Sequence, residues 1–174
     1  MEITKMKILG KYSHLYGQEY LAVRKAHQYA EIEHAVSTIY SQTLRGRNYV
    51  GWWKSFNDWF QSTLQGKGWK SDLSRSFGNQ RANIGTLLLA KNAVGVIAKP
   101  RTKIENDIDL FAVYPWLYTC GTIDVVIVIT PSASLACSFK GDKTRQHMIC
   151  FEEFVHNLEH QPRNNPTVPL LVLG

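Results

Sequence analysis

The sequence predicts a single-domain α/β protein, spanning residues 1–174, in which helices flank a mixed β-sheet. Residues Ile123–Thr130 are almost continuously apolar and β-branched, which is typical of a strand buried on both faces. Helical patterns alternate with short apolar segments, the arrangement expected when helices cover a sheet. The chain has 174 residues, of which 44% are hydrophobic and 20% charged. A domain of this length buries about 70% of the surface of its unfolded chain.

The first half of the chain contains two helical patterns. Gln18–Tyr40 carries apolar residues at helical spacing near its end, and Gly51–Leu64 carries a broad stripe of large side chains. That stripe consists of Trp52, Trp53, Phe56, Trp59, Phe60 and Leu64. Packing in the core is the favoured interpretation of the stripe, and stacking on nucleic-acid bases is the alternative. Gly66 and Gly68 end this helix, and the polar segment Ser71–Gly85 is expected to be a loop.

The middle of the chain predicts a β-hairpin followed by a helix. Strands are expected over Thr86–Ala90 and Ala93–Ala98, with a tight turn at Lys91 and Asn92. Thr102 and Glu105 then fit a capping box, in which each side chain satisfies a free amide at the start of a helix. The core-facing positions of that helix are expected to be Ile104, Ile108 and Phe111, and Pro115 is expected to kink or end it.

The last third completes the predicted fold. After the buried strand Ile123–Thr130, Cys150–Leu158 has the spacing of an amphipathic helix. The apolar run Leu170–Leu173 predicts a final strand. No repeat, low-complexity tract or linker divides the chain.

The charge of the chain favours a polyanionic partner. The formal net charge is +6 at pH 7, and Lys and Arg side chains gain affinity by displacing the counterions of DNA phosphates. Basic residues gather in predicted loops and at element ends, where flexible cations suit contacts with a phosphate backbone. These candidate DNA-binding residues are Arg45, Arg47, Lys67, Lys70, Arg75, Arg81, Arg101, Lys103, Lys140, Lys143 and Arg145.

Several protein classes are disfavoured by the composition. No apolar run approaches the roughly 20 residues that a membrane-spanning helix needs, and the start of the chain is too short and too charged for a secretory signal. The three cysteines are widely spaced and form no metal-binding pair, so we expect reduced thiols and a cytoplasmic location. No glycine-rich phosphate loop or other motif indicates a small-molecule cofactor.

Six segments resemble, in the same order, the BstYI and BglII restriction endonucleases. The N-terminal ones are Lys11–Tyr20 (KYSHLYGQEY) with the helix that follows it, and Lys67–Lys70 (KGWK). The others are Asp109–Phe111 (DLF), Ile123–Val125 (IDV), Thr130-Pro131 and Val168–Gly174 (VPLLVLG). The sequence from Ser71 to Lys91 is not similar to its counterpart and is shorter.

This resemblance implies a homodimeric nuclease with the PD-(D/E)xK fold, a mixed sheet between helices. It implies Mg²⁺-dependent hydrolysis of duplex DNA at a short palindrome with a GATC centre. The helix from Thr102 to about Tyr118 is the expected dimer element. In these enzymes the strand before the DLF helix carries a Glu-x-Gln motif, preceded by an Asp nine residues before the Glu, and the two carboxylates are the expected metal ligands.

The expected metal ligands are missing from the hairpin. Counting back from Asp109 without a gap places the family's Glu at Ile97, its Gln at Lys99 and its Asp at Leu88. Lysine is acceptable at position 99 because many nucleases of this fold use it to stabilise developing charge. No carboxylate occurs between Leu73 and Ile104, although Mg²⁺ requires anionic oxygen ligands.

A relocated site is the alternative to a lost one. Glu105 and Asp109, together with Asp72 from the preceding polar segment, are the candidate metal ligands, and Lys99 and Glu105 are the candidate catalytic residues. Glu105 also has a simpler interpretation as the capping-box residue, and Asp72 as a solvated loop acid. Lys99 equally fits a solvated charge or a phosphate contact.

Three functions therefore remain open from the sequence. The first is a working type II endonuclease with a rearranged metal site. The second is a nuclease-derived DNA-binding or regulatory protein without cleavage. The third is a core that has lost both activities.

Overall fold

The protein has the expected mixed α/β architecture. The computed structural model describes residues 5–39, 48–71, 89–98, 102–139, 141–160 and 167–174, and for residues 75–77 and 80–82 the backbone alone. A five-stranded sheet has the order β1-β7-β6-β5-β4, and a separate two-stranded sheet pairs β2 with β3. The strands are β1 (Lys11–His14), β2 (Arg75–Phe77), β3 (Gln80–Ala82), β4 (Leu89–Lys91), β5 (Val94–Ile97), β6 (Val125–Ile129) and β7 (Leu170–Leu173).

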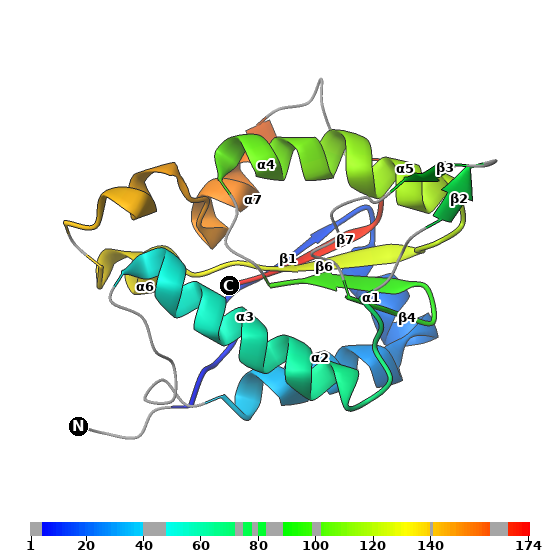
Figure 1. Cartoon of the computed structure of the whole chain (residues 1–174), viewed down its shortest axis with the longest axis horizontal. Helices are drawn as coiled ribbons and strands as arrows, with labels where there is room; N and C mark the ends of the chain where they lie inside the picture. The colour runs from blue at the N-terminus through cyan, green and yellow to red at the C-terminus, as the bar shows by residue number, and fades with distance from the viewer. Residues whose placement is uncertain are drawn as a thin grey trace.

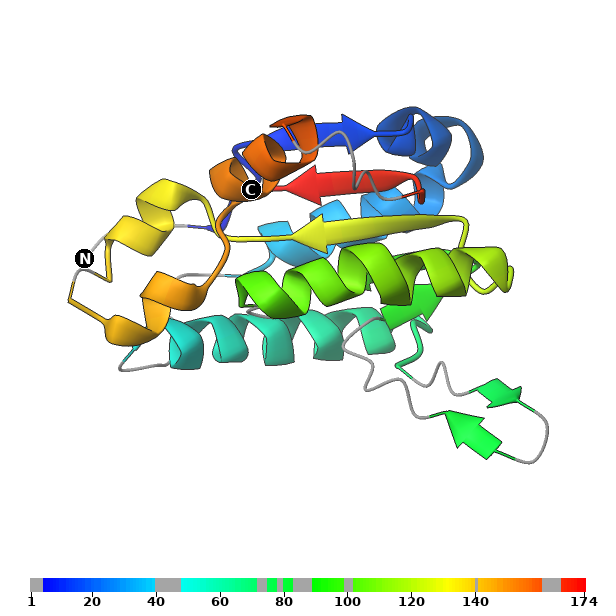
Figure 2. The ribbon, with the colours of Figure 1, turned by 90° about the horizontal axis from the view of Figure 1, so that it is seen from above.

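Helices cover both faces of the five-stranded sheet. In Figure 1, α4 and α5 lie above the sheet and α2 and α3 lie below it. Figure 2 shows α3 and the α4–α5 helix running alongside the strands. The helices are α1 (Gly17–Arg24), α2 (Ala26–Ser37), α3 (Tyr49–Gln65), α4 (Lys103–Ile108), the π-helical η2 (Asp109–Val113), α5 (Tyr114–Thr119), α6 (Ala133–Cys137), the 3₁₀ helix η3 (Lys143–His147) and α7 (Phe151–His160). Among the described helices, none is long and apolar enough to cross a bilayer.

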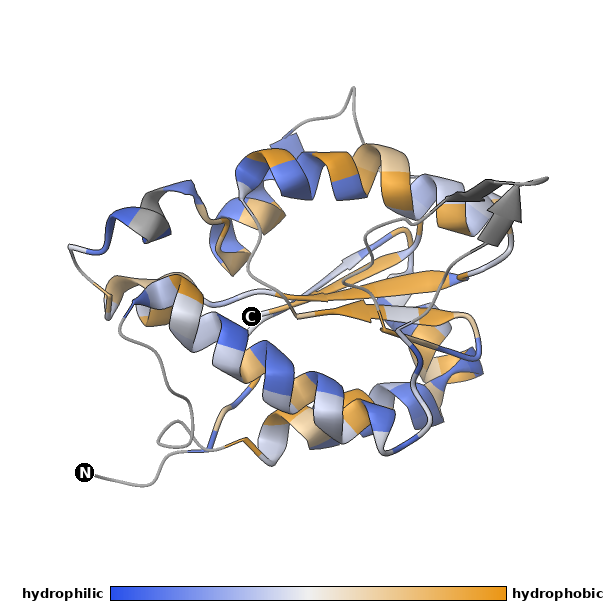
Figure 3. Ribbon diagram, in the orientation of Figure 1, coloured by the Kyte–Doolittle hydropathy of each residue, from blue (hydrophilic) through white to orange (hydrophobic). Residues whose placement is uncertain are grey.

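The core is organised around the predicted central strand β6. It pairs in parallel with β5 on one side and β7 on the other, and all of its residues are buried. Val125, Ile127 and Ile129 belong to the core cluster shared with α1, α2 and α3, whereas Val126 and Val128 belong to the cluster shared with α5 and α7. The sheet is accordingly hydrophobic between helices of mixed character (Figure 3). The predicted two-sided burial is confirmed.

The predicted continuous helix Gln18–Tyr40 is wrong, because the chain forms two helices that break at Lys25. Its backbone leaves the helical region (φ −137°, ψ 30°), and its Nζ donates a hydrogen bond to Asn92 O over 2.8 Å. The Tyr20 hydroxyl donates to the Asp124 carboxylate over 2.9 Å and ties α1 to the start of β6. The break lets α1 contact the sheet while α2 packs against α3.

The aromatic stripe of α3 is confirmed as core at all but one position. Trp53, Phe56 and Phe60 are almost fully buried, and the rings of Trp53 and Phe56 stack with centroids 4.6 Å apart. Trp59 departs from the expectation, because it is 46% exposed. The Asn48 side chain accepts a hydrogen bond from Gly51 N and so caps the start of the helix.

The β4–β5 hairpin turns one residue later than predicted. Lys91 pairs with Val94, so Asn92 and Ala93 form a two-residue turn with φ of 50° and 64°. Two positive φ values match the right-handed twist of the flanking strands, which favours this turn. The segment Ser71–Gly85, expected to be a loop, instead contains the paired strands β2 and β3.

A nearly buried carboxylate joins α2 to this hairpin. Lys91 Nζ lies 2.8 and 2.9 Å from the two Glu31 carboxylate oxygens, and Trp69 Nε1 donates to the same carboxylate over 2.8 Å. Burial raises the pKa of Glu31, but the hydrogen bonds from Lys91 and Trp69 outweigh it and hold the pKa below its ordinary value. The ionised form is therefore the one that the folded protein stabilises.

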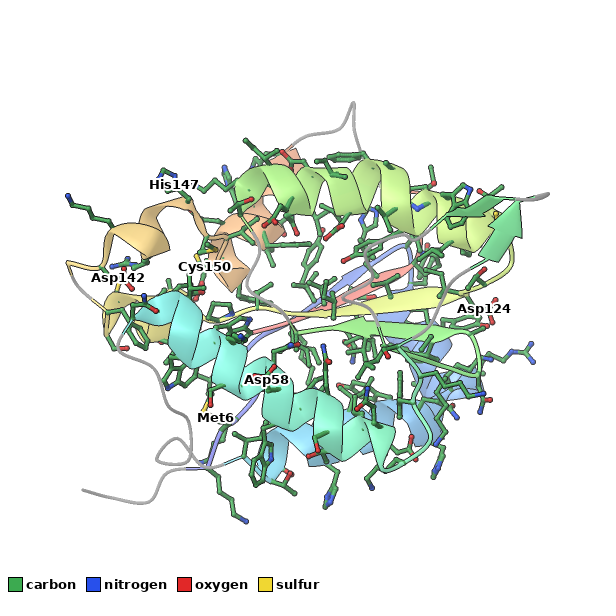
Figure 4. The ribbon with its side chains drawn as sticks, viewed as in Figure 1. Met6, Asp58, Asp124, Asp142, His147 and Cys150 are labelled. Atoms are coloured by element: carbon green, nitrogen blue, oxygen red, sulfur yellow. The ribbon has the colours of Figure 1, made fainter. Side chains whose placement is uncertain are left out.

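We expect Glu31→Gln to lower the free energy of unfolding by about 2 kcal/mol at pH 7, because charged hydrogen bonds are lost from a nearly buried site. In the parent protein this contribution is present above the ordinary carboxyl pKa of 4.5 and is lost as the pH falls below it. Urea denaturation at pH 7 and at pH 3.5 measures both effects. The exposed Asp58→Asn on α3 is the control (Figure 4). Equal pH dependence in parent and Glu31→Gln would contradict the assignment.

Candidate functional site

The strand expected to carry a metal ligand supplies an apolar side chain to the core. Ile97, the last residue of β5, pairs with Val128 of β6 and is 3% exposed. Its side chain belongs to the core cluster that also includes Leu110 and Phe154. The position to which the resemblance assigns a glutamate therefore contributes to packing. Lys99 and Leu88, the other two positions of the motif, lie outside the described residues.

The predicted capping box at the start of α4 is confirmed. Glu105 N donates to Thr102 Oγ1 over 3.2 Å, and Thr102 N donates to Glu105 Oε2 over 2.9 Å. Thr102 Oγ1 also lies 3.0 Å from the same carboxylate oxygen. Glu105 is exposed to solvent. One of its carboxylate oxygens is therefore engaged in stabilising the helix N-terminus.

The helical segment over residues 103–119 is rotated about its axis, so that it buries a different face from the predicted one. Ile104, Ile108 and Phe111, predicted to face the core, are 73%, 54% and 39% exposed, so this prediction is wrong. The residues of the segment that are buried are Asn106, Asp109, Leu110, Tyr114 and Leu117. Leu110, Tyr114 and Leu117 pack on the sheet and determine the rotation of the whole helix. Asn106 and Asp109 consequently turn inward.

The helix also continues through Pro115. Residues 109–113 form a π-helical turn in which Tyr114 N donates to Asp109 O, after which α5 runs to Thr119. Proline has no amide hydrogen and its ring clashes with the carbonyl four residues earlier in an α-helix. A π turn immediately before the proline relaxes that regular hydrogen-bond pattern, so the chain remains helical.

The two candidate acids of this helix have different environments. Glu105 is exposed at the N-terminus, whereas Asp109 is 4% exposed beneath the helix. Asp72, the third candidate ligand, lies outside the described residues. Within the part of the chain that the structure describes, no three His, Cys, Asp or Glu side chains are grouped to hold a metal.

The candidate DNA-binding residues that the structure describes fall into separate groups. Lys67 and Lys70 are exposed beyond the C-terminal end of α3. Lys143 and Arg145 lie on η3, which contacts α3. Just before η3, the Asp142 carboxylate accepts a hydrogen bond from Tyr49 N at the other end of α3 over 2.6 Å. A 17-residue helix is about 25 Å long, so α3 separates the two groups by roughly that distance.

The remaining candidates are distributed over other segments. Lys103 begins α4, and its Nζ lies 3.1 Å from the Glu153 carboxylate of α7. Arg75 lies in β2 and Arg81 lies in β3. The candidates that lie outside the described residues are Arg45, Arg47, Arg101 and Lys140.

A charged cavity near η3 was not predicted from the sequence. It has a volume of about 320 Å³ and is lined by residues that include Tyr49, Asp142, Arg145, Cys150 and Glu153. Figure 4 shows Asp142 and Cys150 near the same end of the molecule. Burial raises the pKa of the Cys150 thiol, which disfavours the reactive thiolate. All the lining residues except Tyr49 come from residues 133–153, so the cavity depends on how this segment folds against the start of α3 and matches no known motif.

Comparison with known protein families accounts for almost the whole chain. A family model described as Restriction endonuclease BglII/BglIII matches residues 9–174, a range that includes every strand and helix given above. A search of curated proteins finds no individual match. Restriction endonucleases are nucleases that bind DNA and generally use a divalent metal. The mixed sheet between helices agrees with their fold, and the chain therefore belongs to the BglII/BglIII restriction endonuclease family.

Proposed function

We propose that the protein is a cytoplasmic type II restriction endonuclease, with a single domain, that hydrolyses duplex DNA at a short palindrome using Mg²⁺. The observation that carries this proposal is the family match, which extends over residues 9–174. The net charge of +6 supports binding to a polyanion. A GATC-type centre for the palindrome rests on the sequence resemblance alone.

A specific observation favours a second function, DNA binding or regulation without cleavage. Ile97 is buried in the apolar core where a metal-binding glutamate would stand. Mg²⁺ sheds its hydration shell reluctantly and is bound through carboxylates in phosphoryl-transfer sites. A strand that supplies only apolar side chains to the core gives the ion no such ligand.

In the enzyme hypothesis the site moves to the helix that follows the strand. Lys99 would stabilise charge or activate water, and Glu105, Asp109 and Asp72 would supply the metal ligands. The exposed position of Glu105 supports its access to DNA. Its engagement with Thr102 supports the alternative role, in which it only caps the helix.

We also propose that the protein is a homodimer that associates through the helix from Thr102 to about Tyr118. Its outer face carries Ile104, Ile108, Phe111 and Tyr118, which are 73%, 54%, 39% and 41% exposed. Contiguous exposed apolar residues on one helix are typical of a protein-interaction surface. A second copy of the chain would bury this stripe against its own equivalent.

The two functions are separated by combining a cleavage assay with a binding assay. We expect affinity for duplex DNA to fall steeply with salt, with a log–log slope of about 0.9 for each phosphate contact. Discrete plasmid fragments with Mg²⁺, absent with EDTA, would establish the endonuclease. Salt-sensitive binding without cleavage in Mg²⁺ or Mn²⁺ would establish the binding protein. Weak binding that does not change with salt would contradict both.

A pair of variants distinguishes a ligand from a helix cap at Glu105. Glutamine is also accepted at this position of a capping box, so Glu105→Gln removes the carboxylate and retains the cap. If Glu105 is a ligand, we expect Glu105→Gln to abolish cleavage and the rise in Tm that Mg²⁺ produces. Thr102→Ala should instead lower stability by about 1 kcal/mol and retain both metal effects. Unchanged cleavage in Glu105→Gln would leave the residue only its capping role.

We expect the double variant Ile104→Ser with Ile108→Ser to convert the dimer into a monomer, because it removes two apolar side chains from the stripe. Sedimentation velocity over a hundredfold range of concentration measures the oligomeric state. Val23→Ser is the matched control, since Val23 is 79% exposed on α1, away from the stripe. A double variant that remains dimeric would place the interface elsewhere.

A further inference from the structure

The chain makes an excursion from the edge of the sheet between Lys70 and Ala90. Lys70 N donates to Ala90 O over 3.0 Å, and Ala90 N donates to Lys70 O over 2.8 Å. The two ends of the excursion are therefore held side by side. Within it, β2 and β3 pair with each other and form a two-stranded antiparallel ribbon, separate from the five-stranded sheet in the part of the chain that the structure describes.

The segment that precedes this ribbon carries two exposed lysines and is held by several hydrogen bonds. Lys91 Nζ donates to Lys67 O over 2.7 Å and also binds Glu31, which fixes the end of α3 to the hairpin. Trp69, between the two exposed lysines Lys67 and Lys70, is buried and bonded to the same carboxylate. The two lysines thus lie on a hydrogen-bonded segment at the point where the chain leaves the five-stranded sheet.

The residues of the ribbon are of the kinds that read DNA bases. The backbone register pairs Arg75 with Ala82, Ser76 with Arg81 and Phe77 with Gln80. Cross-strand partners share a face and successive pairs alternate, so Arg75 and Gln80 belong to one face and Arg81 to the other. Arginine recognises guanine and glutamine recognises adenine through paired hydrogen bonds, and a two-stranded ribbon fits the major groove.

We propose that the β2–β3 ribbon is the sequence-reading element of this protein and enters the major groove of duplex DNA. Arg75 and Gln80, which belong to the same face of the ribbon, contact base edges, while Lys67 and Lys70 contact phosphates at its base. This inference rests on the proposed DNA binding, and it adds to it the residues that determine specificity. No acidic residue occurs from Arg75 to Ala82, so nothing in the ribbon repels the phosphate backbone.

The test begins with the preferred sequence of the wild-type protein, selected from a random duplex library. Affinities for the selected and a scrambled duplex are then measured at several salt concentrations. We expect Arg75→Ala and Gln80→Ala each to reduce the ratio of the two affinities about tenfold or more, because a base contact is lost. Lys67→Ala and Lys70→Ala should weaken both duplexes alike and reduce the salt slope by about one each.

The outcomes separate this inference from the function on which it rests. An unchanged ratio in both ribbon variants, or a wild-type protein that binds duplex DNA and selects no sequence, would overturn the reading role of the ribbon. A wild-type protein without salt-dependent DNA binding would overturn the proposed function itself. Thermal melting of each variant shows whether a reduced ratio of the two affinities is caused by unfolding of the protein.

Discussion

The burial of β6 on both faces is the constraint from which the rest of the structure follows. A strand made only of Val and Ile must be covered on each side, and parallel pairing with β5 and β7 places it in the middle of the sheet. One face is covered by α1, α2 and α3, and the other by α5 and α7. Side chains of the neighbouring strands β5 and β7 enter the same two apolar layers, which restricts the residue types that fit there.

This constraint explains why β5 contributes to packing. A carboxylate at Ile97 would stand in an apolar layer and would require a bound cation to compensate its desolvation. Isoleucine removes that requirement and extends the core formed by Val126, Val128 and Val172. The apolar strand is therefore stable without metal, which is the physical basis of the binding-only hypothesis. Lys67 and Lys70 follow the end of α3 and Lys103 begins α4, so these candidate DNA-binding residues lie outside the apolar layers.

The helix over residues 103–119 shows how one part of a segment can determine the orientation of another. Leu110, Tyr114 and Leu117 bury a large apolar area, and the π turn keeps the segment continuous across Pro115. Burying these three residues outweighs exposing Ile104 and Ile108, because α4 must follow the rotation of α5. The result is an apolar outer stripe and two buried polar residues, neither of which a short-range pattern predicts.

Sequence alone determined the features that depend on neighbouring residues. The all-apolar strand β6, the aromatic face of α3 and the Thr102–Glu105 cap follow from local composition and spacing, and the collinear segments identified the family. Tertiary structure alone decided the helix break at Lys25, which allows α1 and α2 to contact different partners, and the rotation of the 103–119 helix. It also decided the β2–β3 pairing. These features result from competition between distant surfaces for burial, and a local pattern carries no information about which surface prevails.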